Sequence, residues 1–228
     1  MSEITSPKTA ASAPATPAAD ASAIATPQLA DIRQVSDGWI KKYLLTYTMP
    51  DGSTHTYESA SRKSIDAYRT ELEGNARGEQ PTADAVCIVP QTVDGKLLLI
   101  REFRYPLNSW CIAFPAGLKE PDESLASCVN RELREETGYA LRAEADLEGA
   151  PTLEPLPQAG YSSTGLTDET VHVVFAQVEH VADAQPEPNE LIEPFLLPID
   201  DVPRFLAENT TPIGTRAQLI LEAFARRR

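Results

Sequence analysis

Residues 117–138 read GLKEPDESLASCVNRELREETG, and this stretch decides the fold. A helix is predicted from about Ser124 to Thr137, with polar and apolar residues at helical spacing. Gly138 follows at the position where a left-handed residue usually ends a helix. The stretch therefore ends in a helix with a defined C-terminal cap.

Two glutamates of this helix fall on its apolar side. Projected at about 100° per residue, Glu132 and Glu136 lie with Leu125 and Val129. Two like charges one turn apart and directed toward a core repel each other and are costly to desolvate, so a cation must compensate them. A hard divalent cation such as Mg²⁺ binds carboxylate oxygens. The alternative is an acidic cluster that is simply solvated on the surface.

The spacing of the stretch favours the metal-binding alternative, because it resembles the Nudix box, G-x5-E-x7-REUxEExGU, in which U is aliphatic. Tyr139 stands where the last aliphatic residue is usual. The resemblance implies an α/β fold, an α/β/α sandwich with a mixed sheet, and hydrolysis of a phosphoanhydride bond in a nucleoside diphosphate derivative. The matching positions are Gly117, Glu123, Arg131, Glu132, Leu133, Glu135, Glu136 and Gly138.

The resemblance also implies a metal site on the helix. Glu132, Glu135 and Glu136 are the implied ligands of Mg²⁺ or Mn²⁺, together with the backbone carbonyl of Ala116. Glu135 is also placed among the catalytic residues.

The resemblance implies structural roles for other matched positions of the box. Glu123 pairs with Arg131 and ties down the loop before the helix. Gly117 and Gly138 are assigned to the backbone of the motif rather than to its chemistry.

Further segments resemble the ADP-ribose pyrophosphatase branch of the family, from Trp39 to the last strand. This resemblance implies that the substrate is an ADP-sugar, with ADP-ribose as the leading candidate. Ala113 stands where the branch usually has Glu, and Thr164 stands where it usually has Pro, so the choice of sugar or base can differ. The resembling segments are REFRYP at 101–106, CIAFPAG at 111–117 and STGLTDE at 163–169, with Pro155 at a position where the branch has a proline.

Hydrolysis needs a group that takes a proton from the attacking water. Members of the family place a glutamate for this purpose in the loop after the box. Glu169 occupies that position, and Asp168 is the alternative base.

Five residues are candidates for substrate binding. Arg104 follows a strand and can bind a phosphate through its guanidinium fork, unless it forms a surface ion pair. Trp39 and Tyr57 match positions where relatives stack aromatic rings on the base, one from each subunit, with Glu58 and Arg62 nearby for polar contacts. An aromatic residue in a strand is otherwise a core residue. The resemblance therefore implies a homodimer.

The domain organisation follows from composition and pattern. Residues 1–30 are an Ala/Pro-rich tail that is predicted to be disordered. Residues 31–84 are predicted to form a β-hairpin extension, a polar helix near Ser64–Glu73 and a connecting segment, used for dimerisation and base binding. The segment between Arg62 and Thr82 looks longer than in close relatives. Residues 85–228 form the predicted hydrolase domain, with strands near 85–90, 96–103, 110–114 and 171–176 and helices near 201–208 and 215–227.

Composition restricts partners and compartment. A net charge of −14 argues against charge-driven nucleic-acid binding. No apolar run is long enough for a membrane span, and the N-terminus lacks the pattern of a secretion signal. The three cysteines contain no CxxC pair, which favours a reduced, cytoplasmic protein.

Two rival functions remain. The substrate can be another dinucleotide or nucleotide sugar, such as a GDP-sugar, NADH or a diadenosine compound. The protein can also be a sensor that binds a nucleotide sugar without cutting it. The intact acidic residues of the box and of the 163–169 segment, and the lack of a recognisable DNA-binding domain, argue against a sensor.

Overall fold

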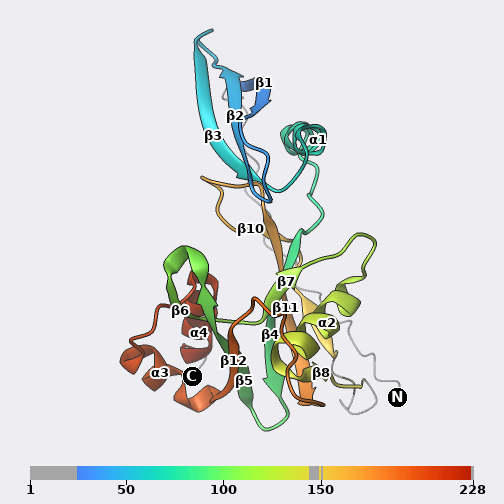
Figure 1. Cartoon of the computed structure of the whole chain (residues 1–228), viewed down its shortest axis with the longest axis vertical. Coiled ribbons are helices and arrows are strands. Elements are labelled where there is room, and N and C mark those ends of the chain that lie inside the picture. The colour runs from blue at the N-terminus through green and yellow to red at the C-terminus, as the bar shows by residue number, and fades with distance from the viewer. Residues whose placement is uncertain (1–24, 144–148, 150, 227–228) are drawn as a thin grey trace, which may run out of the picture.

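The computed structural model describes residues 25–143, 149 and 151–226. The chain forms an N-terminal extension (residues 28–76) and a main domain (residues 85–226), each with its own sheet. Figure 1 shows the extension at one end of the molecule and the main domain at the other. Within the described part of the chain, no helix has the length and apolar character needed to cross a membrane.

The extension is a three-stranded antiparallel sheet with one helix packed against it. Its small core contains Ile32, Tyr43, Leu45 and Tyr68, and the rings of Tyr43 and Tyr68 meet edge to face with centroids 5.0 Å apart. The elements are β1 (Gln28–Gln34), β2 (Lys41–Thr48), β3 (Thr54–Ser61) and α1 (Ile65–Ala76).

The predicted hairpin is β2 and β3, and the predicted polar helix is α1. Two predictions need correction. The extension has a third strand, and β1 begins at Gln28, so residues 28–30 do not belong to a disordered tail. A register shift between Leu29 and Asp31 breaks the strict alternation by which a strand is recognised in a sequence. Residues 1–24 of the predicted tail lie outside the described residues, and residues 25–27 form no helix or strand.

The main domain is built on a mixed sheet in the order β10-β11-β4-β5-β12. β4 and β11 are parallel, whereas β5 and β12 are antiparallel, which agrees with the predicted mixed sheet. The main strands are β4 (Ala85–Thr92), β5 (Lys96–Arg104), β11 (Thr170–His180) and β12 (Ile192–Pro198); the short ones are β6 (Ser109–Ala113), β7 (Ala116–Leu118), β8 (Tyr139–Leu141), β9 (Leu153–Pro155) and β10 (Gly160–Tyr161).

Both faces of this sheet are covered by helices. Along β4, Val86 and Ile88 belong to one core cluster, while Cys87 and Val89 belong to the other. A strand buried on both faces reads as a continuous apolar run, which is why this strand was predictable. The helix α2 covers the first face, and α3 and α4 cover the second (Figure 1), giving the predicted α/β/α sandwich. The helices are α2 (Leu125–Thr137), α3 (Val202–Glu208) and α4 (Thr215–Ala225), with short 3-10 helices at Tyr105–Leu107 and Ile199–Asp201.

β12 was not predicted, because Pro194 and Pro198 interrupt its apolar pattern. Proline cannot donate to a sheet ladder and is confined to edge strands, and β12 lies at the edge beside β5.

The extension touches the main domain where β3 ends. The backbone N–H of Ala60 donates to the carbonyl of Leu166 at 2.9 Å, and Ala60 and Thr167 form an isolated parallel bridge. The loop before β11 is therefore fixed from the side of the extension.

Candidate active site

The helix α2 begins and ends at residues suited to those positions. Ser124 caps its N-terminus by accepting a hydrogen bond from the backbone N–H of Ser127 at 3.1 Å. Gly138 ends it with φ of 75°, and a Cβ at this position would overlap the carbonyl of Ala182. Only glycine meets both the conformation and the close approach there.

Glu132 and Glu136 are buried, as the helical projection predicts, with exposed fractions of 8% and 4%. Glu136 Oε2 accepts a hydrogen bond from the backbone N–H of Ala116 at 3.1 Å. A Cβ on Gly117 would overlap the carboxylate of Glu132, so the chain passes close to both carboxylates at residues 116–117. Burial and the charge of Glu132 raise the pKa of Glu136 well above its ordinary value. Burial raises the pKa of Glu132 too, although Arg131 acts against the rise.

Arg131 joins the loop to the helix. Its Nε and Nη2 donate to the two carboxylate oxygens of Glu123 at 3.1 and 3.0 Å, and Nη2 also donates to the carbonyl of Leu118. Its Nη1 reaches Glu132 at 2.7 Å and Glu135 at 3.3 Å. These hydrogen bonds, chiefly those from Arg131, lower the pKa of Glu123 to about 2. The predicted pair of Glu123 and Arg131 is present.

The donors at this helix are of the kind that a hard divalent cation takes. Glu132 and Glu136 bring two carboxylates into a poorly solvated position beside the Ala116 peptide, and Arg131 contacts only the first of them. Glu135 is more exposed, with 46% of its side chain accessible. In the described ranges, no three His, Cys, Asp or Glu side chains are gathered closely enough to hold a metal ion as they stand.

A cavity of about 590 Å³ lies against residues 116–117 on the side of β6 and α4. It brings together residues that are far apart in the sequence: the predicted site residues, the departure at Ala113, and one arginine that sequence reasoning missed. We call it the cleft. Its polar or sequence-predicted lining residues include Arg62, Arg104, Ala113, Ala116, Glu169 and Arg216.

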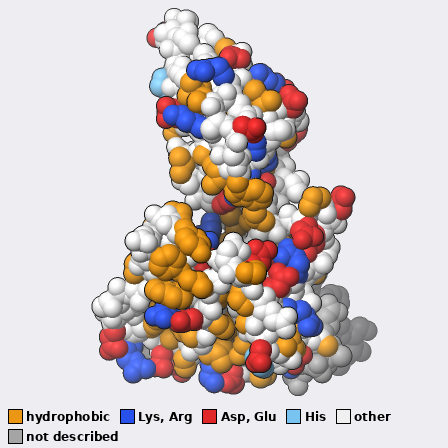
Figure 2. Space-filling view, in the orientation of Figure 1, with side chains coloured by type: hydrophobic (Ala, Val, Ile, Leu, Met, Phe, Trp, Pro, Cys, Tyr) orange, Lys and Arg blue, Asp and Glu red, His pale blue; other side chains and the backbone are white. Residues whose placement is uncertain are grey.

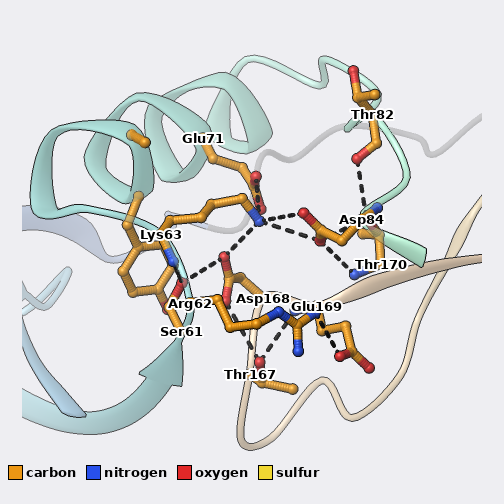
Figure 3. Close-up of polar contacts among 12 residues, drawn as sticks. Ser61, Arg62, Lys63, Glu71, Thr82, Asp84, Thr167, Asp168, Glu169 and Thr170 are labelled. Carbon is orange, nitrogen blue, oxygen red and sulfur yellow. Dashed lines mark hydrogen bonds and ion pairs between the residues drawn. The ribbon is translucent and has the colours of Figure 1, made fainter. Parts of the chain in front are cut away.

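The two candidate bases lie in different surroundings. Glu169 lines the cleft, keeps 23% of its side chain exposed, and pairs with Arg62 at 2.7 Å. Burial acts to raise the pKa of Glu169, but hydrogen bonds with Ser162 and Arg62 outweigh it, so the pKa lies below its ordinary value. Asp168 is only 7% exposed and accepts hydrogen bonds from Ser61 and Lys63 at 3.0 and 2.9 Å. Figure 3 shows Asp168 facing the lysine while Glu169 points away from it.

Three arginines line the cleft, and they differ in their partners. Arg62 pairs with Glu169, and Arg104 pairs with Glu102 at 2.7 Å. Arg216 forms no ion pair within the described part of the chain. Its charge nevertheless acts to lower the pKa of Glu169, so its guanidinium group lies near that carboxylate.

Arg216 is presented by the first turn of α4, whose start is attached to β6. The backbone N–H of Ile112 donates to the carbonyl of Pro212 at 2.7 Å, and the N–H of Gly214 donates to the carbonyl of Ile112 at 2.9 Å. The sequence around Arg216 carries no recognisable motif, and only this contact between distant segments brings it to the cleft. No local signal could have found it.

Within one chain, the residues predicted to bind the base do not lie in a single site. Trp39 is 73% exposed and lines a cavity of about 870 Å³ together with Arg62. Tyr57 lines a different, more apolar cavity, which Thr164 also lines, and donates through its hydroxyl to the carbonyl of Gly165 at 2.8 Å. Glu58 pairs with Lys42 at 2.8 Å. Of these residues, only Arg62 reaches the cleft.

Comparison with known proteins places these features in a family. Residues 81–216 match the family described as NUDIX domain. The chain is 31% identical over 200 residues to the ADP-sugar pyrophosphatase of Mus musculus, covering 83% of this chain and 79% of that protein. It is 30% identical over 177 residues to the ADP-ribose pyrophosphatase of Saccharomyces cerevisiae, covering 75% and 70%.

The fold is also that of a solved structure. A crystal structure of ADP compounds hydrolase superposes with a TM-score of 0.67 at 21% sequence identity, covering 90% of this chain and 95% of that one. The family match spans most of the main domain, including the loop, the helix α2 and every residue of the box. The chain therefore belongs to the NUDIX domain family.

Proposed function

We propose that the protein hydrolyses the pyrophosphate bond of a nucleoside diphosphate sugar, with ADP-ribose cut to AMP and ribose 5-phosphate as the leading reaction. One observation carries the proposal: a single cleft is bounded by Glu169 on one side and, on the other, by residues 116–117, which touch the buried Glu132 and Glu136. The names of the mouse and yeast relatives support the substrate class.

Members of the family generally use divalent metal ions, and here we propose Mg²⁺ or Mn²⁺. Glu132, Glu135 and Glu136 would hold the ion together with the carbonyl of Ala116. When bound, it would supply positive charge next to the phosphates, in addition to the arginines of the cleft.

The protein's own groups then position and activate the water. Glu169 accepts the proton of a water whose oxygen attacks one phosphorus, and the bond from that phosphorus to the bridging oxygen breaks. Arg62 keeps the Glu169 carboxylate ionised and directed into the cleft. Arg104 and Arg216 bind phosphate oxygens through their guanidinium groups.

The base is bound, in this proposal, between aromatic rings of two subunits of a homodimer. Trp39 and Tyr57 are exposed and line different cavities of the same chain, which supports a site completed by a second copy. Glu58 and Arg62 are the proposed polar contacts. The compartment we propose is the cytoplasm, since Cys87, Cys111 and Cys128 are all free and buried.

The residue at position 113 favours a tolerance for other substrates. Ala113 lines the cleft where a carboxylate is usual in this branch, so the wall offers one polar contact fewer. Other ADP-sugars are therefore expected to be cut within about tenfold of the rate for ADP-ribose. A GDP-sugar, NADH or a diadenosine compound is the second candidate class, and a non-cutting sensor is the third.

The test is product analysis by anion-exchange chromatography with Mg²⁺ or Mn²⁺. ADP-ribose, other ADP-sugars, a GDP-sugar, NADH and diadenosine compounds are compared, with Glu136→Gln as the inactive control. We expect AMP and ribose 5-phosphate from ADP-ribose, and turnover lowered far more than threefold in the control. Cleavage of GDP-sugar or NADH alone would contradict the ADP-sugar assignment, and binding without cleavage of any compound would favour a sensor.

A further inference from the structure

Both chain neighbours of Glu169 are held by buried or partly buried hydrogen bonds. On one side, Asp168 accepts from Ser61 Oγ at 3.0 Å and from Lys63 Nζ at 2.9 Å. On the other side, Asp84 Oδ2 accepts from the backbone N–H and the hydroxyl of Thr170 at 2.9 and 3.0 Å. Glu169 therefore stands between two residues that cannot easily move.

Lys63 connects the two sides. Its ammonium group contacts Asp168 at 2.9 Å, Asp84 at 3.0 Å and Glu71 of α1 at 3.1 Å. Figure 3 shows this group at the centre of the three carboxylates, which come from α1, from the residue before β4 and from the loop before β11. We call these four residues the Lys63 cluster.

The ion pair of Lys63 with Asp168 lies next to the ion pair of Arg62 with Glu169 in the cleft. Arg62 directly precedes Lys63, and Glu169 directly follows Asp168, so two adjacent cations meet two adjacent carboxylates. The outer pair, Arg62 and Glu169, faces the cleft. The inner pair is Lys63 and Asp168, and the side chain of Asp168 is only 5% exposed. The inner pair thus fixes the backbone that carries the outer pair.

Charge and burial make these contacts costly to break. One ammonium group is surrounded by three carboxylates, and the exposed fractions of Lys63 and Glu71 are only 22% and 16%. Burial acts to lower the pKa of Lys63, but its hydrogen bonds to Asp168 and Asp84 outweigh this and raise it. Removing the cation would leave three neighbouring carboxylates without the positive charge that compensates them.

We infer that Lys63, held by Glu71 of α1, is a positioning residue that sets the place of Glu169 by fixing the residues on both sides of it. The inference rests on the proposed role of Glu169 as the base. It gives the N-terminal extension a part in hydrolysis within its own chain, in addition to any contact with a second subunit. The helix α1 lies in the segment between Arg62 and Thr82.

The physical reason is that proton transfer needs the carboxylate within hydrogen-bond reach of the water. A shift of about 1 Å in such a group can lower a rate by about 10²-fold. Loss of position, unlike loss of a binding contact, lowers kcat and leaves KM nearly unchanged.

The experiment compares Lys63→Met and Ser61→Ala with a matched control, Lys96→Met. Lys96 also forms an ion pair, with Asp94 at 2.7 Å, but at the exposed turn between β4 and β5. Ser61→Ala removes one hydrogen bond to Asp168 without changing any charge, so an effect on kcat must come through position. The readouts are kcat and KM, the pH dependence of kcat, and hydrogen exchange of the backbone amides of residues 163–170.

For Lys63→Met we expect kcat to fall by about 10- to 100-fold with little change in KM. Glu169 is faced by Arg62, Arg216 and Ser162. If its pairing with Arg62 loosens, its pKa rises and the acidic limb of the pH profile moves to higher pH. Exchange at residues 163–170 should become faster. Ser61→Ala should change kcat and exchange in the same direction but less, and Lys96→Met should change nothing.

Three outcomes overturn the inference. The first is a folded Lys63→Met with the kcat and exchange of the parent. The second, if Lys63→Met does not fold, is Ser61→Ala and Glu71→Gln with unchanged kcat and unchanged exchange at residues 163–170. The third is faster exchange with full kcat, which would make the cluster purely structural. If Glu169→Gln keeps full turnover, the proposed role of Glu169 as the base fails. If the parent cuts no nucleotide sugar, the proposed function fails. In both cases the exchange data still show whether Lys63 holds the loop.

Discussion

At the scale of single residues, Glu169 and Asp168 are neighbours in the chain with opposite surroundings. Glu169 faces the cleft, and Asp168 is buried against Lys63. We predict that Glu169→Gln lowers kcat by about 10²-fold or more without lowering thermal stability. Asp168→Asn should lower thermal stability, with a smaller loss of kcat. Steady-state kinetics and thermal melts measure both, and the reverse ranking in kcat would move the base to Asp168.

Arg216 is the cleft arginine that has no carboxylate partner among the described residues, so its charge is available to a phosphate. Arg216→Ala should raise KM by about tenfold or more, since a charge-assisted hydrogen bond contributes about 1.5–3 kcal/mol. Arg226→Ala is the matched control, because Arg226 follows the far end of α4 and pairs with Glu222. An unchanged KM in Arg216→Ala would show that the substrate phosphates lie elsewhere in the cleft.

The scale of single residues also shows how far sequence reasoning reaches. Glu132 and Glu136 could be placed in the interior because helical spacing is local information, and the structure buries both. The contact of Lys63 with Asp168 joins residues 105 positions apart, and Lys63 belongs to no recognised motif. Such a contact follows only from how the extension docks on the main domain.

At the scale of elements, the loop before α2 is attached to the helix by Glu123 and Arg131. The pKa of Glu123 is lowered from 4.5 to about 2, so its ionised form stabilises the folded state above pH 4.5. That stability is lost as the pH falls from 4.5 toward 2. We therefore predict that Glu123→Gln is less stable than the parent at pH 7, and that the difference narrows below pH 4.5.

Urea unfolding of the metal-free proteins at pH 7, 5 and 3.5 measures this difference. At each pH the free energy of unfolding of Glu123→Gln is compared with that of the parent at the same pH, so that destabilisation by acid common to both proteins cancels. A difference that stays constant over the series would mean that Glu123 acts through its shape and not through its charge.

Elements were predictable where their pattern is regular. β4 and β5 read as apolar runs, and α2 carries caps at both ends. β1 and β12 were not predicted, because a register shift in one and prolines in the other break the period of two. Both strands form through pairing with a neighbour that the local sequence does not reveal.

At the scale of the whole molecule, Figure 2 shows a hollow between the extension and the main domain, with hydrophobic side chains on both sides of it. Exposed apolar residues that line cavities shared by the extension and the main domain include Trp39, Ile40 and Leu166, which are 73%, 60% and 59% exposed. Such surface is usually covered by a partner. A second copy of the chain is the partner we propose.

If Trp39 and Tyr57 act from different subunits, mutant chains should complement each other. Trp39→Ala and Tyr57→Ala homodimers should each bind ADP-ribose weakly, because each site lacks one ring. In a mixed dimer, one site lacks both rings and the other has both, so refolding the two mutants together should restore part of the affinity. Titration of the mixture against each mutant alone checks this, and no recovery would place both rings in the same subunit's site.

The prolines of β12 have a consequence for self-association. An open sheet edge offers a row of backbone groups to which another chain can add a strand, and such addition can continue into aggregates. At the edge formed by β12, Pro194 and Pro198 offer no N–H to an incoming strand. The prolines thereby hinder the addition of further strands at this edge of the main sheet. A protein that exposes apolar surface elsewhere can then form a defined oligomer at high concentration without aggregating through this edge.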